Sequence, residues 1–215
     1  VYVTLAIAIV LVVLMIYIFL GSIRATIIPA VTVPVSLIAT FSVVYAFGFS
    51  INLLTLLALV LAIGIVVDDA IIVLENIVRR IHDNKEPPLL AAYRGTRQVG
   101  FAVIATTMVL ISVFVPITFL TGDLGRLFTE FAITMAAAIF FSGITALTLS
   151  AMMSSKILQA EHKENKVVEF IDRHFKRMRR SYVRLLGKAL RRPVIVVIGL
   201  LALLLGTWGI YNVLP

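Results

Sequence analysis

Residues 53–76 read LLTLLALVLAIGIVVDDAIIVLEN, a long apolar run that contains charged residues. Every residue before Asp68 is uncharged, and nearly all of them are Leu, Ile, Val or Ala. A helix needs about 20 such residues to cross the hydrocarbon core of a bilayer. Two adjacent carboxyl groups, those of Asp68 and Asp69, then interrupt the apolar run. The stretch therefore predicts a transmembrane helix that carries buried acids.

The rest of the chain is also strongly apolar. Hydrophobic residues make up 61% of the 215 residues and charged residues 14%, and the mean hydropathy is +1.09. A soluble domain is about half apolar and needs charged residues over its surface. Residues 25–67 contain no Asp, Glu, Lys or Arg at all. This composition predicts an integral membrane protein of the all-α class.

Six apolar segments are long enough to cross a bilayer as helices that rise 1.5 Å per residue. They are residues 2–20, 25–47, 53–78, 99–120, 127–153 and 193–214. The Gly48, Ser50 and Asn52 cluster favours a turn between the second and third segments. We expect a polytopic helical membrane protein in three parts. Five spans occupy residues 1–158, a cytoplasmic loop occupies 159–192, and the sixth span occupies 193–215.

The cytoplasmic loop contains a further predicted helix. Between Val167 and Ala189, apolar residues recur at steps of three and four, and Arg and Lys residues fill the remaining arc. This pattern is typical of an amphipathic helix with a cationic face. We expect the helix to lie in the inner membrane interface, near anionic lipid, although a solvated helix packed on its own protein has the same pattern.

The positions of the basic residues predict the orientation. Every Lys and Arg except Arg126 lies on one side of the predicted spans, and basic loops stay on the cytoplasmic side. Both chain ends then face the opposite, outer side. The net charge of +8 therefore indicates contact with membrane lipid and no nucleic-acid partner. Because Val1 lies directly inside a span with no basic region before it, we expect a fragment or a processed chain, and not a signal peptide.

The adjacent acids Asp68 and Asp69 are the main candidate site. Burying a carboxylate in a spanning helix costs at least a few kcal/mol, so such residues mark ion pathways more often than scaffolding. Successive helical positions point about 100° apart, which lets both carboxyls face one cleft between helices. Burial and mutual repulsion both disfavour the charged forms. We expect this pair to carry protons, and the alternative is a polar cluster that fixes helix packing.

The other polar residues of the spans carry weaker signals. Glu75 and Asn76 are secondary candidates, but they lie where the helix leaves the membrane, and a solvated cap role is favoured there. The hydroxyl residues of the spans, Ser142 among them, are candidate donors of hydrogen bonds between helices, and most of them are expected simply to make packing contacts. The chain has no Cys, no Gly-rich phosphate loop and no zinc signature, so no cofactor and no metal are expected.

Three runs resemble the resistance-nodulation-division (RND) transporters, in their hydrophobe/amphiphile multidrug efflux branch. These are SIRATIIPAVTVPVSLIATF, FGFSINLLTLLALVLAIGIVVDDAIIVLENI and MVLISVFVPITFLTGDLGRLFTEFAITMAAAI. The resemblance extends over nearly the whole chain and is weakest in residues 159–192. The acidic pair of the family matches Asp68 and Asp69. The resemblance implies a proton/drug antiporter, which is a secondary transporter and not an enzyme.

The same resemblance implies a larger assembly. The six spans match family helices two to seven of twelve, so the porter and docking regions lie outside this sequence, as do the family's Lys partner of the acids and its polar relay residues. Hydrophobic or amphiphilic drug-like substrates would bind in those regions. The family also implies the inner membrane, a homotrimer, a periplasmic adaptor and an outer-membrane channel.

Three other functions compete with drug export. An RND-related lipid exporter and a non-catalytic membrane scaffold both remain open. An intramembrane aspartyl protease also uses two acids within lipid, but it needs them on facing helices that share a water molecule. Asp68 and Asp69 are consecutive on one helix, and no second span supplies an Asp. The sequence therefore disfavours the protease.

Overall fold

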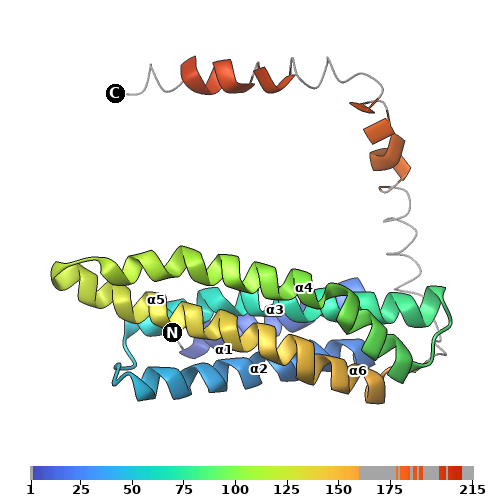
Figure 1. The fold of residues 1–215 in the computed structure, drawn as a ribbon, viewed down its shortest axis with the longest axis horizontal. Coiled ribbons are helices and arrows are strands. Elements are labelled where there is room, and N and C mark those ends of the chain that lie inside the picture. The colour runs from blue at the N-terminus through green and yellow to red at the C-terminus, as the bar shows by residue number, and fades with distance from the viewer. Residues whose placement is uncertain are drawn as a thin grey trace. The chain divides into compact units, whose positions relative to one another are not determined.

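The structure is a computed structural model that describes residues 2–159, 178, 180–184, 186–187, 189–190, 199–201 and 203–209. The chain divides into two compact units, Val1–Lys163 and Glu164–Pro215, and each is considered by itself. All regular elements of the described residues are helical (Figure 1). This finding confirms the predicted all-α class.

The first unit is a bundle of helices that lie side by side (Figure 1). Its helices are α1 (Tyr2–Leu20), α2 (Ile23–Ala46), α3 (Leu53–Asp83), α4 (Pro88–Phe114), α5 (Gly122–Thr145) and α6 (Ala151–Ile157). A 3-10 helix, η1 (Val115–Phe119), follows α4, and a π-helix, η2 (Ala146–Ser150), joins α5 to α6.

Four helical stretches are long and apolar enough to cross a membrane. They are Ile23–Ala46, Leu53–Asp83, Pro88–Phe119 and Phe128–Ile157, and they match four of the six predicted segments. The first predicted segment is the helix α1, whose apolar part Ala6–Ile18 is shorter. In the second unit, Gly199–Gly209 is a short apolar helix. The total of six spans stays a prediction.

The amphipathic helix predicted within residues 167–190 lies largely outside the described residues. Described positions from Met178 to Leu190 are helical, and Met178 and Tyr182 are exposed within their unit. Residues 167–177 are outside the described part of the chain. Its place in a membrane interface also stays a prediction.

The helices extend beyond the apolar segments at the turn between α3 and α4. The predicted span ended at Val78, but α3 continues to Asp83, and α4 already begins at Pro88. A helix satisfies its own backbone hydrogen bonds, so it continues into water after its apolar residues end. Proline at the first position of α4 suits a helix start, because its missing N–H group has no helical partner there.

The polar turn predicted between the second and third segments is confirmed. Gly48 adopts a φ of +68°, a left-handed conformation that favours glycine. Asn52 then forms a capping box with Thr55, in which its side-chain oxygen accepts hydrogen bonds from the first turn of α3. The Asn52 side-chain amide also donates to Glu130 of α5. The start of α3 is therefore fixed against α5.

The helix α3 lies at the centre of the first unit. It packs against α1, α2, α4 and α5, and its fully buried side chains include Leu59, Ile63, Leu74 and Ile77. Leu59 and Ile63 share a core cluster with Met135 and Ile139 of α5, and Leu74 and Ile77 belong to a second cluster with Ala91 and Val103 of α4. Because α1, α2, α4 and α5 all pack against α3, its rotation about its own axis is fixed. Packing therefore decides which of its polar residues are buried.

Candidate functional site

Asp69 lies in the buried interface between α3 and α5. Its side chain is 5% exposed, and the hydroxyl of Ser142 on α5 donates to its carboxyl Oδ2 over 2.7 Å. The same hydroxyl lies 3.1 Å from the backbone carbonyl of Val66, one helical turn before Asp69. Ser142 is itself 1% exposed. The acid is therefore held by a single buried hydroxyl that has two acceptors within reach.

The two acceptors around Ser142 suit both protonation states of Asp69. A hydroxyl has one hydrogen, so it donates to one acceptor at a time, and its oxygen can accept as well. When Asp69 is charged, Ser142 can donate to the carboxylate. When Asp69 is protonated, its own O–H can donate to the Ser142 oxygen, and Ser142 can then donate to the Val66 carbonyl. The Asp69 Oδ2 atom and the Ser142 hydroxyl therefore have a hydrogen-bond partner in both protonation states of the acid.

Close packing of α4 against α5 fixes the position of Ser142. The next residue is Gly143, and a Cβ added there would lie 2.8 Å from the Thr107 hydroxyl of α4. A larger residue at this position would force the Thr107 side chain to shift, so the glycine allows α4 and α5 to approach closely. The π-helix η2 begins at Ala146, one turn further on, and such π segments occur frequently at functional sites. Ser142 is therefore one of the candidate hydroxyl residues that do donate a hydrogen bond to another helix, and its acceptor is the acid.

Asp68 lies in a different environment from Asp69. It is on the exposed surface of α3, and the two carboxyls do not share a cleft between described helices. Within the described residues the two acids thus differ in burial, and a cleft that both carboxyls face in the complete transporter stays a prediction. Because successive helical residues point about 100° apart, the Asp69 carboxyl lies in the α5 interface and the Asp68 carboxyl lies outside it.

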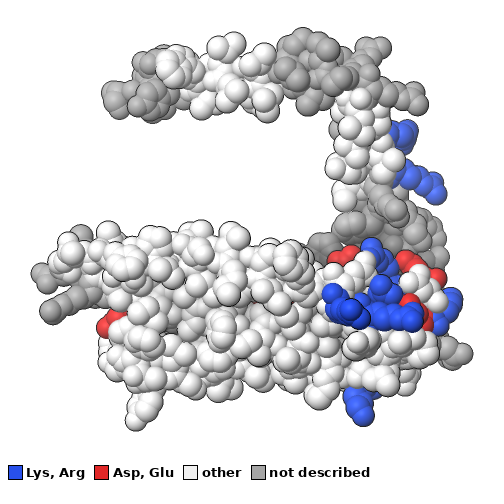
Figure 2. Space-filling model, viewed as in Figure 1, with Lys and Arg blue, Asp and Glu red and all other residues white. Residues whose placement is uncertain are grey.

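Neither acid has a cation nearby in the described part of the chain. The ion pairs there both use Glu86, which lies 3.1 Å from Arg80 and 3.4 Å from Arg94. These residues belong to the end of the unit where α3 meets α4, and Figure 2 shows Lys and Arg side chains gathered there. We call this end the basic end. Within the described residues, no three His, Asp or Glu side chains are grouped to hold a metal ion.

The secondary candidate Asn76 joins α3 to α4. It is 6% exposed, its amide donates to the Gly95 carbonyl over 2.8 Å, and its oxygen accepts from Arg79 over 2.9 Å. A Cβ added to Gly95 would lie 3.0 Å from Ile77 Cγ1 and 3.3 Å from its Cα. The two backbones therefore approach closely at this point. Asn76 fixes helix packing and does not contact Asp69 in the structure.

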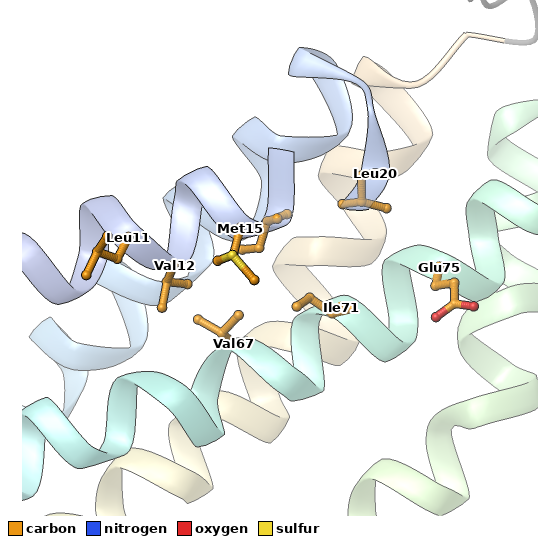
Figure 3. A pocket seen from close by; sticks show the side chains of 8 residues that line it. Leu11, Val12, Met15, Leu20, Val67, Ile71 and Glu75 are labelled. Carbon is orange, nitrogen blue, oxygen red and sulfur yellow. The ribbon is translucent and has the colours of Figure 1, made fainter. Parts of the chain in front are cut away.

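The secondary candidate Glu75 does not cap α3, contrary to expectation. The helix continues for two further turns and ends at the C-cap Asn84, because α3 is longer than its apolar segment. Glu75 is exposed and lies at one end of an apolar cavity between α1 and α3 (Figure 3). The four predicted site residues thus lie in separate environments, and the structure does not bring them together.

Close packing at Gly95 leads to a stability prediction. Gly95→Leu should force α3 and α4 apart and break the Asn76 hydrogen bond, which lowers the free energy of unfolding by about 2–4 kcal/mol. Gly64→Leu is the control, because no atom lies within 4 Å of a Cβ added there. Unfolding in mixed micelles, followed by circular dichroism, measures both. Equal stability of the two variants would contradict the close approach.

The comparison with known protein families agrees with this arrangement. The model for the AcrB/AcrD/AcrF family matches residues 1–215, which is the whole of the sequence. The proteins of this family are RND transporters, and they are not in general enzymes. Four long apolar helices, with an acidic pair in the central one, are consistent with the membrane part of such a transporter. The chain therefore belongs to the AcrB/AcrD/AcrF family of RND transporters.

Proposed function

We propose that this chain forms the proton-translocating membrane part of an RND antiporter, with Asp69 as the proton carrier. The observation that supports it most is the burial of Asp69 between α3 and α5, with Ser142 as its side-chain partner. A buried acid in an apolar helix is costly unless it has a task. A scaffold would be more stable with an apolar residue at this position.

Proton binding can change the packing between α3 and α5. The Ser142 hydroxyl donates to the charged acid and accepts from the protonated acid, so the hydrogen-bond direction across the interface reverses with the proton. The charge of Asp68, on the exposed face of α3, interacts with the charge of Asp69, because adjacent charges interact strongly in a low-dielectric medium. Protonation of Asp69 therefore removes a repulsion on Asp68. Each protonation state then favours a different packing, and that difference can bias distant parts of the transporter.

The Asp68 carboxylate, on the exposed face of α3, requires a polar or cationic partner within the membrane. Contact of a carboxylate with hydrocarbon is costly, and the described helices leave this face open. The family resemblance implies that this partner is a Lys from another helix of the complete transporter. A cation there would hold the charged pair and would be released when protons neutralise it.

The substrates and partners follow from the family resemblance alone. We propose hydrophobic or amphiphilic compounds as substrates, which bind outside this sequence. We also propose an inner-membrane homotrimer that works with a periplasmic adaptor and an outer-membrane channel. The basic end would face the cytoplasm, and both chain ends the periplasm. An RND-related lipid exporter is the alternative, since it would use the same proton step.

The Ser142 hydroxyl offers the experiment that tests this proposal. Ser142→Ala, in a transporter that contains this chain, should slow proton-coupled transport by about 10- to 150-fold, because a hydrogen bond to a charged group contributes about 1.5–3 kcal/mol. Ser142→Thr keeps the hydroxyl and should retain most of the transport. Proton uptake into proteoliposomes, followed with a pH-sensitive dye, measures the rates.

Thr145→Ala is the matched control for Ser142→Ala. The Thr145 hydroxyl is on the same helix and donates only to the backbone carbonyl of Ser142, so its loss should leave transport close to wild type. Wild-type transport in Ser142→Ala, or an equal loss in Thr145→Ala, would refute the specific role of the Ser142 hydroxyl.

A further inference from the structure

Side-chain hydrogen bonds join α3 to α5 at two points within the described residues. At one point Ser142 donates to Asp69, and at the other the side-chain amide of Asn52 donates to the Glu130 carboxyl. Between these points lies the apolar core cluster that contains Leu59, Ile63, Met135 and Ile139. Burial of apolar surface has no preferred direction, so the two polar contacts carry the directional constraint on this pair of helices.

The Asn52 side chain has a fixed orientation relative to α3. Its Oδ1 accepts from the backbone N–H groups of Leu54 and Thr55 over 2.9 and 3.0 Å, and its own backbone N–H donates to the Thr55 hydroxyl over 2.9 Å. Because Oδ1 is engaged in this capping box, the Nδ2 group of the same planar amide points in one direction only. A hydrogen bond from Nδ2 to α5 therefore constrains the rotation of α3 about its own axis.

A rotation of α3 at its first turn also rotates Asp69. The helix is continuous from Leu53 to Asp83, and Asp69 lies about 25 Å along its axis from Asn52. A rotation of about 20° moves a side-chain atom about 5 Å from the axis by about 1.7 Å. The hydrogen bond from Ser142 to Asp69 is 2.7 Å long, and a displacement of that size is enough to break it. The Asn52 contact thus acts on the acid through the helix.

Glu130 is suited to holding Asn52 in place. It is partly buried, and its carboxyl takes part in no ion pair within the described residues. The Thr134 hydroxyl donates to its backbone carbonyl and leaves its carboxyl to Asn52. A charged acceptor makes a hydrogen bond about twice as strong as a neutral one does. On the far side of Asp69, the tie of α3 through Asn76 is to α4 and not to α5.

We propose that Glu130 is a positioning residue for the proton carrier. By binding the capping side chain of Asn52, its carboxyl sets the rotation of α3 at which Asp69, and not Asp68, meets Ser142. Glu130 lies about 18 Å along α5 from Ser142, so it acts through α3 and not by contact with the acid. The consequence for transport rests on the proposed function, whereas the effect on α3 rests on the hydrogen bonds alone.

Spin labels on the two helices of the purified full chain measure the rotation. Leu57 on α3 and Phe140 on α5 are exposed and can carry them. Asn52→Ser keeps a capping side chain but removes the amide, so the distribution of label distances should broaden and its maximum should shift by about 2 Å. Ser50→Ala is the matched control, because it removes the other acceptor of the same amide, and it should leave the distribution unchanged.

Exchanging donor and acceptor separates this contact from a general loss of stability. Asn52→Asp alone keeps the cap but brings two carboxylates together, so it should broaden the distribution further. Adding Glu130→Gln supplies an amide that donates to the new carboxylate, and this double variant should restore the wild-type distribution. Circular dichroism of each variant verifies the fold.

The infrared band of protonated Asp69, assigned as the part that Asp69→Asn removes, reports on the acid itself. In Asn52→Ser it should shift in the same direction as in Ser142→Ala, and the double variant should reverse the shift. In a transporter that contains this chain, Asn52→Ser should slow transport about fivefold, less than Ser142→Ala does, because packing limits the rotation. The double variant should recover most of the rate.

Three results would overturn the proposal. The first is an unchanged label distribution in Asn52→Ser, and the second is a double variant that behaves like Asn52→Asp alone. The third is a changed distribution with an unchanged Asp69 band, which would mean that α3 turns without moving the acid. Absence of an Asp69 band in the wild type would instead refute the proposed function, and the label distances would still decide whether Glu130 sets the rotation of α3.

Discussion

Replacing Asp69 with Asn is expected to stop proton-coupled transport by a transporter that contains this chain. The fall should be about 100-fold or more, the scale on which loss of a proton-transferring group acts. Asn keeps the size of the side chain, and its amide oxygen can still accept from Ser142, but it cannot ionise. The loss would therefore be chemical and not steric. Efflux of a fluorescent substrate from proteoliposomes under an imposed pH gradient measures it.

Two controls separate loss of the proton carrier from loss of the fold. The Asp69→Asn variant should insert into membranes and unfold like the wild type, since the Ser142 contact is preserved. Asp83→Asn makes the same chemical change at an exposed position near the end of α3, and it should transport normally. If Asp69→Asn retains more than about half of wild-type transport, the acid is not the carrier.

Asp68→Asn is expected to abolish transport without changing the stability of this chain. Asp68 is exposed and forms no ion pair within residues 2–159, so its replacement should change the free energy of unfolding by less than about 0.5 kcal/mol. Its charge is nevertheless needed if a cation covers this face of α3 in the complete transporter. Transport assays of the transporter and unfolding of the isolated chain, done in parallel, measure the two effects.

The combination of results assigns the role of Asp68. Lost transport with unchanged stability supports a function in the charged pair. A loss of stability in the isolated chain would instead indicate a packing role. Retained transport in the Asp68→Asn variant would mean that Asp69 works alone. These readouts differ from those for Asp69, because only Asp69 contacts α5 in the structure.

The sequence predicts the location of the acids but not the difference between them. The charged pair in an apolar run identifies the helix and its depth in the membrane. Which carboxyl is buried depends on how α2, α4 and α5 surround α3, and no local pattern records that rotation. A rotation of about 100° separates the two side chains, so the orientation of α3 within the bundle decides which of them is buried.

The sequence could not single out Ser142 among the hydroxyl residues of the spans. Spanning helices contain many Ser and Thr residues, and most of them donate to a carbonyl of their own helix. Thr106, Ser112 and Thr148 do so in this structure. Only the packing of α5 on α3 distinguishes Ser142 from them. The adjacent Gly143 was a usable signal, since a small residue next to a hydroxyl favours close helix packing in membranes.

The role of Glu75 was misjudged because apolar segments and helices have different ends. The apolar run indicates where the hydrocarbon stops, and the prediction placed the helix end at the same point. The Asn84 cap, the positive φ of Lys85 and the proline at the start of α4 mark the true end further along the chain. The residue types Asn84, Pro87 and Pro88 were visible in the sequence, whereas the φ of Lys85 is known only from the structure. The cavity beside Glu75 was not predictable, because α1 forms its other wall.

Infrared difference spectroscopy of the purified chain across a pH titration can detect proton exchange at Asp69 itself. If Asp69 carries the proton, the wild type should show a protonated-carboxyl band whose intensity changes with pH. Part of that band should disappear in Asp69→Asn, shift in Ser142→Ala because its hydrogen bond is lost, and persist in Asp83→Asn. A band that is identical in the wild type and Asp69→Asn would show that this acid does not exchange a proton, and would contradict the account.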